Sequence, residues 1–133
     1  PGSVVAQGCD HAIELATGPE VLTGSTRLKA GTATKMVLNM ISTGAFVRLN
    51  KVYENLMVDV RATNAKLRAR SVRIVAQACS CDHALAQQAL ESAGGQVKVA
   101  IVARLRDVGV QRAATLLERH GGSVRAALAE ERS

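Results

Sequence analysis

Aromatic residues are nearly missing from this sequence of 133 residues, which contains one phenylalanine, one tyrosine and no tryptophan. Because 47% of the residues are apolar, the chain can still bury a core, but alanine, valine, leucine, isoleucine and methionine have to fill it. A core of this kind favours helices. The lack of aromatic rings also argues against a protein that stacks the bases of single-stranded nucleic acid.

Long apolar runs and a cysteine framework are missing as well. No stretch approaches the roughly 18 apolar residues of a membrane-spanning helix, and the pattern of a signal peptide is absent. The three cysteines, Cys9, Cys79 and Cys81, are an odd number, and two of them are almost adjacent, which does not indicate disulfides. We therefore expect a protein of the reducing cytoplasm with no membrane partner.

Positive charge is in excess, with 17 lysines and arginines against 11 acidic residues. The densest cluster is predicted to lie on one helix and consists of Arg61, Lys66, Arg68, Arg70 and Arg73. Such a face can follow a phosphate backbone, but neither zinc-finger spacing nor an RNA-binding signature accompanies it. A helix face in water is the simpler interpretation, so no nucleic-acid partner is expected.

The first residues have the pattern of the end of a larger α/β domain. Ser3 is placed to cap a short turn that ends near Gly8, and residues 11–16 alternate weakly, as a short strand does. Gly18 and Pro19 end this strand. A single strand cannot pair its own backbone groups, so its neighbours have to lie outside this sequence or in another chain.

Residues 32–49 predict a helix whose apolar residues cover nearly its whole circumference. A helix that is apolar on all sides is buried on all sides. In so small a protein this indicates a position between a sheet and a second subunit. After a break at residues 50–51, a second helix is expected from about Glu54 to Ala78, with the basic cluster on its polar face.

The last third of the sequence repeats itself with a period of 27 residues. Residues 86–101 align with residues 113–128, and both copies contain Leu-Glu, two further residues, Gly-Gly, one residue and Val. Each copy predicts a helix that ends at a left-handed glycine, a tight turn, and a new helix that begins beside the valine. We expect a compact module of a few short helices over residues 80–133.

The polar segment of residues 18–35 lies immediately before the predicted buried helix and contains hydroxyl groups, cations and glycines. Free amides at a helix start, together with hydroxyl groups and cations, form an anion site, for which phosphate is the natural ligand. The alternative is that a hydroxyl group such as that of Ser25 only caps the helix while the cations pair with carboxylates. Glu20 can accept a sugar hydroxyl, act in proton transfer, or pair with Arg27 or Lys29.

Residues 79–83, Cys-Ser-Cys-Asp-His, lack the second ligand pair of a convincing zinc site, so no metal is expected. Asp82 is instead a good cap for the helix that follows. The histidines have no cysteine or serine partner in the sequence pattern that would indicate a nucleophile and its base.

Several long sequence motifs are more specific than the patterns described so far. Residues 18–35, Leu38-Asn39-Met40, residues 51–60 (Lys-Val-Tyr-Glu-Asn-Leu-Met-Val-Asp-Val) and residues 62–67 (Ala-Thr-Asn-Ala-Lys-Leu) closely resemble the N-acetylmuramic acid 6-phosphate etherases, bacterial enzymes of cell-wall sugar recycling. The resemblance covers essentially the whole sequence. Glucokinase regulatory proteins are similar in the Gly-Ser-Ser/Thr-Arg-x-Lys portion, but the run at residues 51–60 is that of the etherases.

The resemblance implies a sugar isomerase domain, an α/β sandwich that binds a phosphosugar, followed by helices and a small tail similar to ubiquitin-associated domains. It implies a homodimer and a mostly α chain in three parts. Residues 1–50 would be the last strand and dimer helix of a truncated sandwich, residues 51–79 a connecting helix, and residues 80–133 the helical module.

The resemblance also implies an activity. Etherases of this family open the sugar ring, remove the C2 proton, expel D-lactate from C3 and add water, with two glutamates as acid and base and no metal or organic cofactor. Both glutamates are expected upstream, so we predict no catalytic residue in this chain and no activity of the chain alone.

Five residues are predicted to line the phosphosugar site of this or the neighbouring subunit: Glu20, Ser25, Thr26, Arg27 and Lys29. Alternatively, these side chains only brace the loop. A second function class also stays open, namely a non-catalytic protein that senses sugar phosphates, as the regulatory proteins do.

Overall fold

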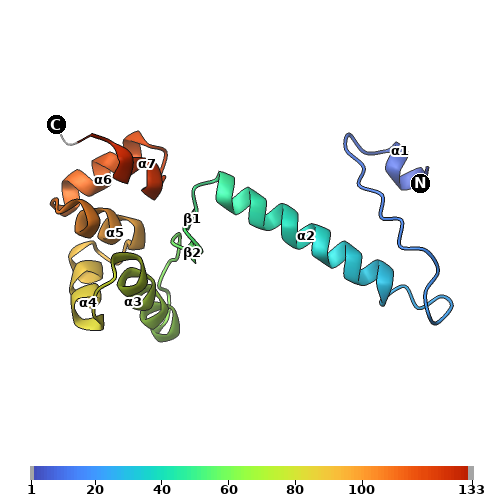
Figure 1. Cartoon of the computed structure of the whole chain (residues 1–133), viewed down its shortest axis with the longest axis horizontal. Coiled ribbons are helices and arrows are strands. Elements are labelled where there is room, and N and C mark those ends of the chain that lie inside the picture. Colours follow the sequence, from blue (N-terminus) through green and yellow to red (C-terminus); the bar gives the residue numbers. More distant parts are fainter. Residues whose placement is uncertain (1, 132–133) are drawn as a thin grey trace. The chain divides into compact units, whose positions relative to one another are not determined.

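The computed structural model describes residues 2–131 and is mostly helical, with one antiparallel two-stranded sheet (Figure 1). In chain order the elements are α1 (Val4–Gln7), α2 (Lys29–Arg48), β1 (Val52–Tyr53), β2 (Leu56–Met57), α3 (Ala65–Cys79), α4 (His83–Ser92), α5 (Val97–Arg106), α6 (Val110–Arg119) and α7 (Val124–Ala129). The chain divides into two compact units, the first ending at Ala45 and the second beginning at Phe46. None of the described helices combines the length and hydropathy that crossing a membrane requires. The expectation of a mostly α chain is confirmed.

The first unit begins with a short helix and has no regular structure between that helix and α2. Ser3 caps α1, since its Oγ accepts a hydrogen bond from the amide of Ala6 at 3.2 Å, and the helix ends at Gly8 as predicted. Between residues 11 and 16 the described chain forms no strand. A strand exists only through hydrogen bonds to a neighbour, and the described residues offer none here. The sheet therefore stays a prediction.

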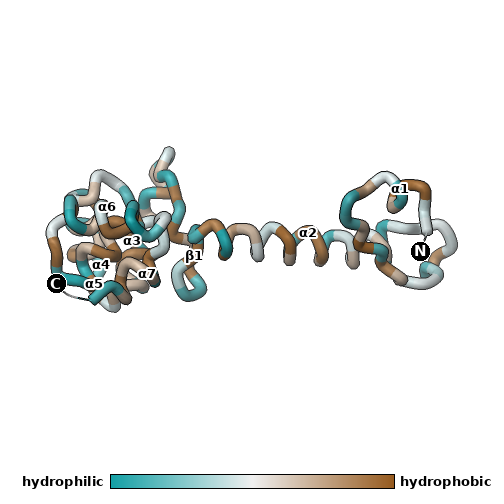
Figure 2. Tube along the Cα trace, turned by 90° about the horizontal axis from the view of Figure 1, so that it is seen from above, coloured by the Kyte–Doolittle hydropathy of each residue, from teal (hydrophilic) through white to brown (hydrophobic). Residues whose placement is uncertain are grey.

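Helix α2 confirms the helix predicted over residues 32–49 and begins three residues earlier, at Lys29. Apolar residues are distributed along it (Figure 2). None of its residues is buried within this chain, and the side chains of Met36 and Met40 are 56% and 62% exposed. The described residues do not supply the burial that the sequence pattern predicts. The position of α2 between a sheet and a second subunit therefore stays a prediction.

The second predicted helix begins later than expected. A hairpin of β1 and β2 occupies the place where its first turn was expected, because Glu54 turns the chain back with a left-handed φ of 52°. The register pairs Val52 with Met57 and Tyr53 with Leu56. Apolar residues at positions 56, 58 and 60 alternate with the period of extended chain, which the helical interpretation missed. Asn64 then caps α3 by accepting a hydrogen bond from the amide of Leu67 at 2.9 Å.

The sequence repeat is also a structural repeat. Helices α4 and α5 form one copy, and α6 and α7 form the other. Both glycines of each pair have left-handed φ values between 57° and 80°, a conformation that other residues rarely adopt. In both copies the second glycine donates its amide to the carbonyl of the leucine that the two copies share, Gly95 to Leu90 at 2.8 Å and Gly122 to Leu117 at 2.7 Å. These bonds satisfy carbonyls at the helix ends, as predicted.

The core of the second unit is built around α5, which packs against α3, α4, α6 and α7. Ile101 and Val102 on this helix are completely buried. Every buried apolar residue of the described chain is an alanine, valine, leucine or isoleucine. The aliphatic core that the composition predicts is therefore present, in the second unit.

One charged side chain lies in this core. Arg106, at the end of α5, is only 8% exposed. Its Nη1 donates to the carbonyl oxygens of Ala127 at 3.0 Å and Leu128 at 3.4 Å and also contacts the carbonyl of Glu130. The last carbonyls of a helix have no partner inside the helix. Arg106 therefore caps the C-terminal end of α7.

Candidate functional site

The polar segment before α2 is organised by Glu20. Its carboxylate accepts hydrogen bonds from the backbone amides of Lys29 at 2.8 Å and Ala30 at 3.0 Å, the first two residues of the helix. The side chain of Lys29 turns back and donates to the carbonyl of Pro19 at 3.1 Å. Residues 19–20 and the start of α2 are thereby tied together, and Glu20 acts as an acidic cap on the positive end of the helix dipole.

This arrangement affects both the charge of Glu20 and the anion site predicted here. The amide hydrogen bonds from Ala30 and Lys29, aided by the charge of the lysine side chain, lower the pKa of Glu20 and outweigh a small effect of burial. Glu20 is therefore ionised at neutral pH. Two of the amides that a bound phosphate would use are already occupied by the carboxylate. Glu20 pairs with backbone amides of the helix rather than with the guanidinium of Arg27.

The other three candidate residues lie in the same loop without side-chain partners among the described residues. Ser25 is half-buried, while Thr26 and Arg27 are exposed. The carbonyl of Thr26 accepts the amide of Gly31 at 2.8 Å, and a Cβ on this glycine would lie only 3.2 Å from that oxygen. The loop thus brings Glu20 and Lys29 together and leaves the side-chain polar groups of Ser25, Thr26 and Arg27 available.

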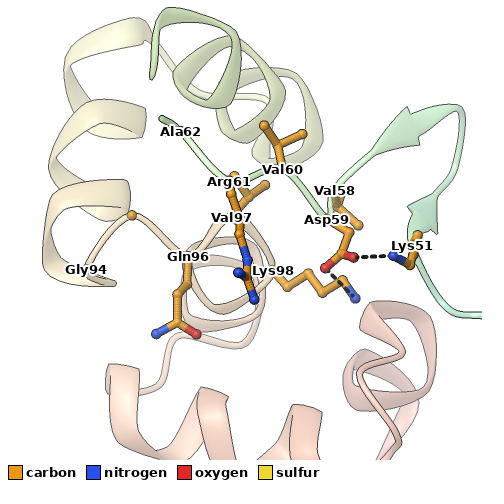
Figure 3. A pocket seen from close by; sticks show the side chains of 11 residues that line it. Lys51, Val58, Asp59, Val60, Arg61, Ala62, Gly94, Gln96, Val97 and Lys98 are labelled. Atoms are coloured by element: carbon orange, nitrogen blue, oxygen red, sulfur yellow. Dashed lines mark ion pairs between the residues drawn. The ribbon is translucent and has the colours of Figure 1, made fainter. Parts of the chain in front are cut away.

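A hollow lies in the second unit. It has a volume of about 750 Å³ and is walled on one side by residues 58–62, which follow β2, and on the other by residues 94–98, which lead into α5 (Figure 3). Lys51 completes the lining. Polar groups outweigh apolar ones on its surface, so the hollow suits a polar ligand better than an apolar one.

One carboxylate connects two of the cations in this hollow. Asp59 forms ion pairs with Lys51 at 3.2 Å and with Lys98 at 3.4 Å. Partial burial by itself would raise the pKa of Asp59, but the hydrogen bond from Lys51 and the charge of Lys98 outweigh it and lower the pKa. Asp59 is thus held in its charged form and lies between the two ammonium groups.

The sequence interpretation missed this hollow. Arg61 was assigned to a helix, but it lies in the extended segment before α3, on the wall of the hollow. Lys51, Asp59 and Lys98 were not singled out. One signal was present, since Asp59 is the only acidic residue between Glu54 and Asp82 and stands in a basic region.

The remaining basic cluster, Lys66, Arg68, Arg70 and Arg73, lies on α3 and is exposed. Among the residues that the structure describes, none of these four side chains forms an ion pair. This is the geometry of a helix face in water, as expected.

Two free thiols lie where α3 ends and α4 has not yet begun, on Cys79, the last residue of α3, and on Cys81. Burial, and to a lesser extent the neighbouring Cys81, raises the pKa of Cys79 to about 11, against a smaller opposing effect of Arg104. Asp82 caps α4 by accepting the amide of Leu85 at 2.8 Å, as predicted. Within residues 2–131, histidine, cysteine and acidic side chains nowhere gather in threes in a geometry that could hold a metal ion.

Comparison with known proteins identifies similar sequences. The family model of the C-terminal lid domain of glucokinase regulatory protein matches residues 54–94. The N-acetylmuramic acid 6-phosphate etherase of Klebsiella aerogenes is 57% identical over 128 residues, which are 96% of this chain and 43% of that protein. The etherase of Rubrobacter xylanophilus is 58% identical over 132 residues, 99% of this chain and 43% of the relative. For the etherase of Streptomyces coelicolor the identity is 57% over 127 residues, 96% of this chain and 41% of the relative.

These matches confirm the resemblance seen in the motifs. Over nearly its whole length, the chain is similar to the C-terminal part of these etherases. The chain spans less than half the length of the curated relatives that it matches.

Proposed function

We propose that this chain is the C-terminal part of an N-acetylmuramic acid 6-phosphate etherase, a cytoplasmic lyase of cell-wall sugar recycling. The observation that carries the proposal is the identity of 57% with the etherase of Klebsiella aerogenes over 96% of the chain. The whole protein cleaves the lactyl ether of its substrate and releases D-lactate and N-acetylglucosamine 6-phosphate. The acid and base glutamates belong to the upstream part.

In this proposal the chain contributes three parts. Residues 1–50 complete a sugar isomerase sandwich and supply α2 as the dimer helix. Residues 51–79 connect this part to residues 80–133, which form a module similar to ubiquitin-associated domains. The exposed apolar side chains of α2 support this assignment, because a helix of that composition is stable in water only when other surfaces cover it. A sheet on one side and the partner subunit on the other provide such surfaces.

The candidate residues divide into two roles. Glu20 and Lys29 hold the loop on the start of α2 through the hydrogen bonds described above. Ser25, Thr26 and Arg27 are the groups offered to the phosphosugar, since a guanidinium and two hydroxyl groups are suited to a phosphate. These three side chains have no partner among the described residues.

The activity is tested on the full-length protein. N-acetylmuramic acid 6-phosphate is added in water enriched in ¹⁸O, and D-lactate is measured with a D-lactate dehydrogenase. We expect release of D-lactate and the label in the C3 hydroxyl of the sugar product, because elimination and hydration take that oxygen from solvent. Absence of D-lactate would refute the proposal.

The role of Arg27 is tested in the same protein. Loss of a charge-assisted hydrogen bond to phosphate removes about 1.5–3 kcal/mol of binding, so Arg27→Gln is expected to lower kcat/KM by roughly tenfold or more. Arg112→Gln is the matched control, since Arg112 is exposed on α6 and has no ion pair among the described residues. An unchanged kcat/KM for Arg27→Gln would leave that residue only a structural role.

A second function has one observation in its favour. The match of residues 54–94 to the lid domain of glucokinase regulatory protein fits a protein that binds a sugar phosphate and does not turn it over. Binding of N-acetylmuramic acid 6-phosphate without release of D-lactate would select this alternative.

The dimer is tested separately by sedimentation of the full-length protein, in which Met40→Glu on α2 is expected to yield monomers.

A further inference from the structure

The hollow of the second unit brings together segments that are far apart in the sequence. Asp59 and Arg61 lie on the extended chain after the hairpin, whereas Gln96 and Lys98 lie at the turn between α4 and α5. Figure 3 shows these side chains around the hollow, with the ion pairs of Asp59 to Lys51 and Lys98 as dashed lines. The hollow of about 750 Å³ is open enough to admit a group of the size of a hexose from solvent.

The charges in this hollow do not balance. Lys51 and Lys98 share the single carboxylate of Asp59, at 3.2 Å and 3.4 Å. Arg61 is exposed, and among the described residues it forms no ion pair. The lining therefore carries three cations against one anion, a surplus of two positive charges. Surplus charge on the wall of a hollow concentrates counter-ions of the opposite sign.

The donors in the hollow are also of the kind that phosphate prefers. A guanidinium presents paired N–H groups that match two phosphate oxygens, and an ammonium group acts as a point charge beside them. The ion pair with Asp59 restrains Lys98, which is itself only 18% exposed, so less ordering of this ammonium group is needed when a ligand arrives. Gln96 adds a neutral amide donor, since its side chain makes no hydrogen bond to the backbone of α5.

We propose that this hollow binds a phosphate monoester, with Arg61 and Lys98 as the principal contacts and Lys51 and Gln96 beside them. The inference goes beyond the proposed function, because it concerns the second unit by itself and stands whether or not the whole protein is a lyase. A phosphate dianion matches the surplus of two positive charges, and a neutral sugar does not. The attached group can be a sugar, for which the hollow has room, or be absent, as in inorganic phosphate.

The test uses the ¹⁵N-labelled full-length protein and its amide NMR spectrum. Inorganic phosphate, glucose 6-phosphate and glucose are added in separate titrations at constant ionic strength. We expect saturable shifts concentrated at residues 94–98 for both phosphates and no such shifts for glucose. Tighter binding of glucose 6-phosphate identifies a sugar phosphate as the ligand, and equal binding identifies the phosphate group alone.

Two variants separate a site from general attraction. Arg61→Gln is expected to weaken phosphate binding by roughly tenfold or more, since it removes a charged donor. Arg112→Gln changes the net charge equally at an exposed position outside the hollow and is expected to change the affinity less than about twofold. The unchanged amide spectrum of each variant without ligand shows that the fold is retained.

Three results would overturn the inference. Equal weakening by both variants means that phosphate is attracted by net charge alone. Shifts that are absent from residues 94–98, or that glucose produces as strongly as glucose 6-phosphate, mean that the hollow does not recognise phosphate. Lys98→Gln is the second measurement if Arg61→Gln alters the free spectrum, and it is expected to weaken binding in the same way.

Discussion

Replacing Arg106 by methionine removes the cap of α7 and leaves most of the core intact. Methionine keeps an unbranched apolar stem of similar reach, so little packing is lost. The guanidinium is lost, and with it the hydrogen bonds of Nη1 to the carbonyl oxygens of Ala127 and Leu128. The Ala127 bond is buried, whereas water can reach the Leu128 carbonyl in the variant.

The expected loss of stability follows from the different burial of these two carbonyls. A buried carbonyl that loses a charged donor costs about 2 kcal/mol, and a half-buried one about 1 kcal/mol. Removing the guanidinium also relieves the desolvation of its charge, which offsets part of the loss. We therefore expect Arg106→Met to lower the free energy of unfolding by about 2 kcal/mol, which for a unit of this size corresponds to a fall in Tm of about 10 °C.

Urea unfolding of the chain, followed by far-UV circular dichroism, measures this change directly. Arg112→Met is the matched control, because Arg112 is exposed and has no ion pair among the described residues, and it is expected to stay within about 0.5 kcal/mol of the parent. If Arg106→Met also stays within about 0.5 kcal/mol, the cap contributes nothing and the reasoning is wrong.

Three further predictions concern other parts of the chain. Leu117→Ala, at a position only 6% exposed, is expected to lower the free energy of unfolding by about 3 kcal/mol in urea, and a loss below about 1 kcal/mol would contradict the described core. The pKa of Asp59 is lowered in the folded chain, so its contribution to stability is complete above the unfolded pKa of about 4 and is lost as the pH falls through the folded pKa. Asp59→Asn is expected to lose less stability than the parent on acidification, as followed by circular dichroism, and parallel curves would contradict this. Because burial raises the pKa of Cys79 to about 11, iodoacetamide is expected to alkylate it at least about tenfold more slowly than the exposed Cys9 at neutral pH, as measured by mass spectrometry; similar rates would mean that Cys79 is not protected.

The sequence predicted the candidate site only where the signal was local. It marked residues 18–35 as polar and as the approach to a helix, and the structure places the start of α2 there. It did not predict that Glu20 would cap that helix, because the residue and its partner amides are separated by a loop whose path no periodicity reveals. The basic hollow was missed for the same reason, since Asp59 and Lys98 meet only after the second unit has packed.

Sequence alone was enough to predict the aliphatic core, a helix over residues 32–49, the caps at Ser3 and Asp82, and the repeated glycine-terminated helices. The core follows from the overall composition, and the helices and caps depend on hydrogen bonds or periodicity within a few neighbouring residues, so the residue types alone carry the information. The hairpin of residues 52–57 and the cap that Arg106 places on α7 became known only from the three-dimensional structure. Those outcomes depend on packing and on contacts between distant residues, which outweigh local preference and leave no local pattern in the sequence.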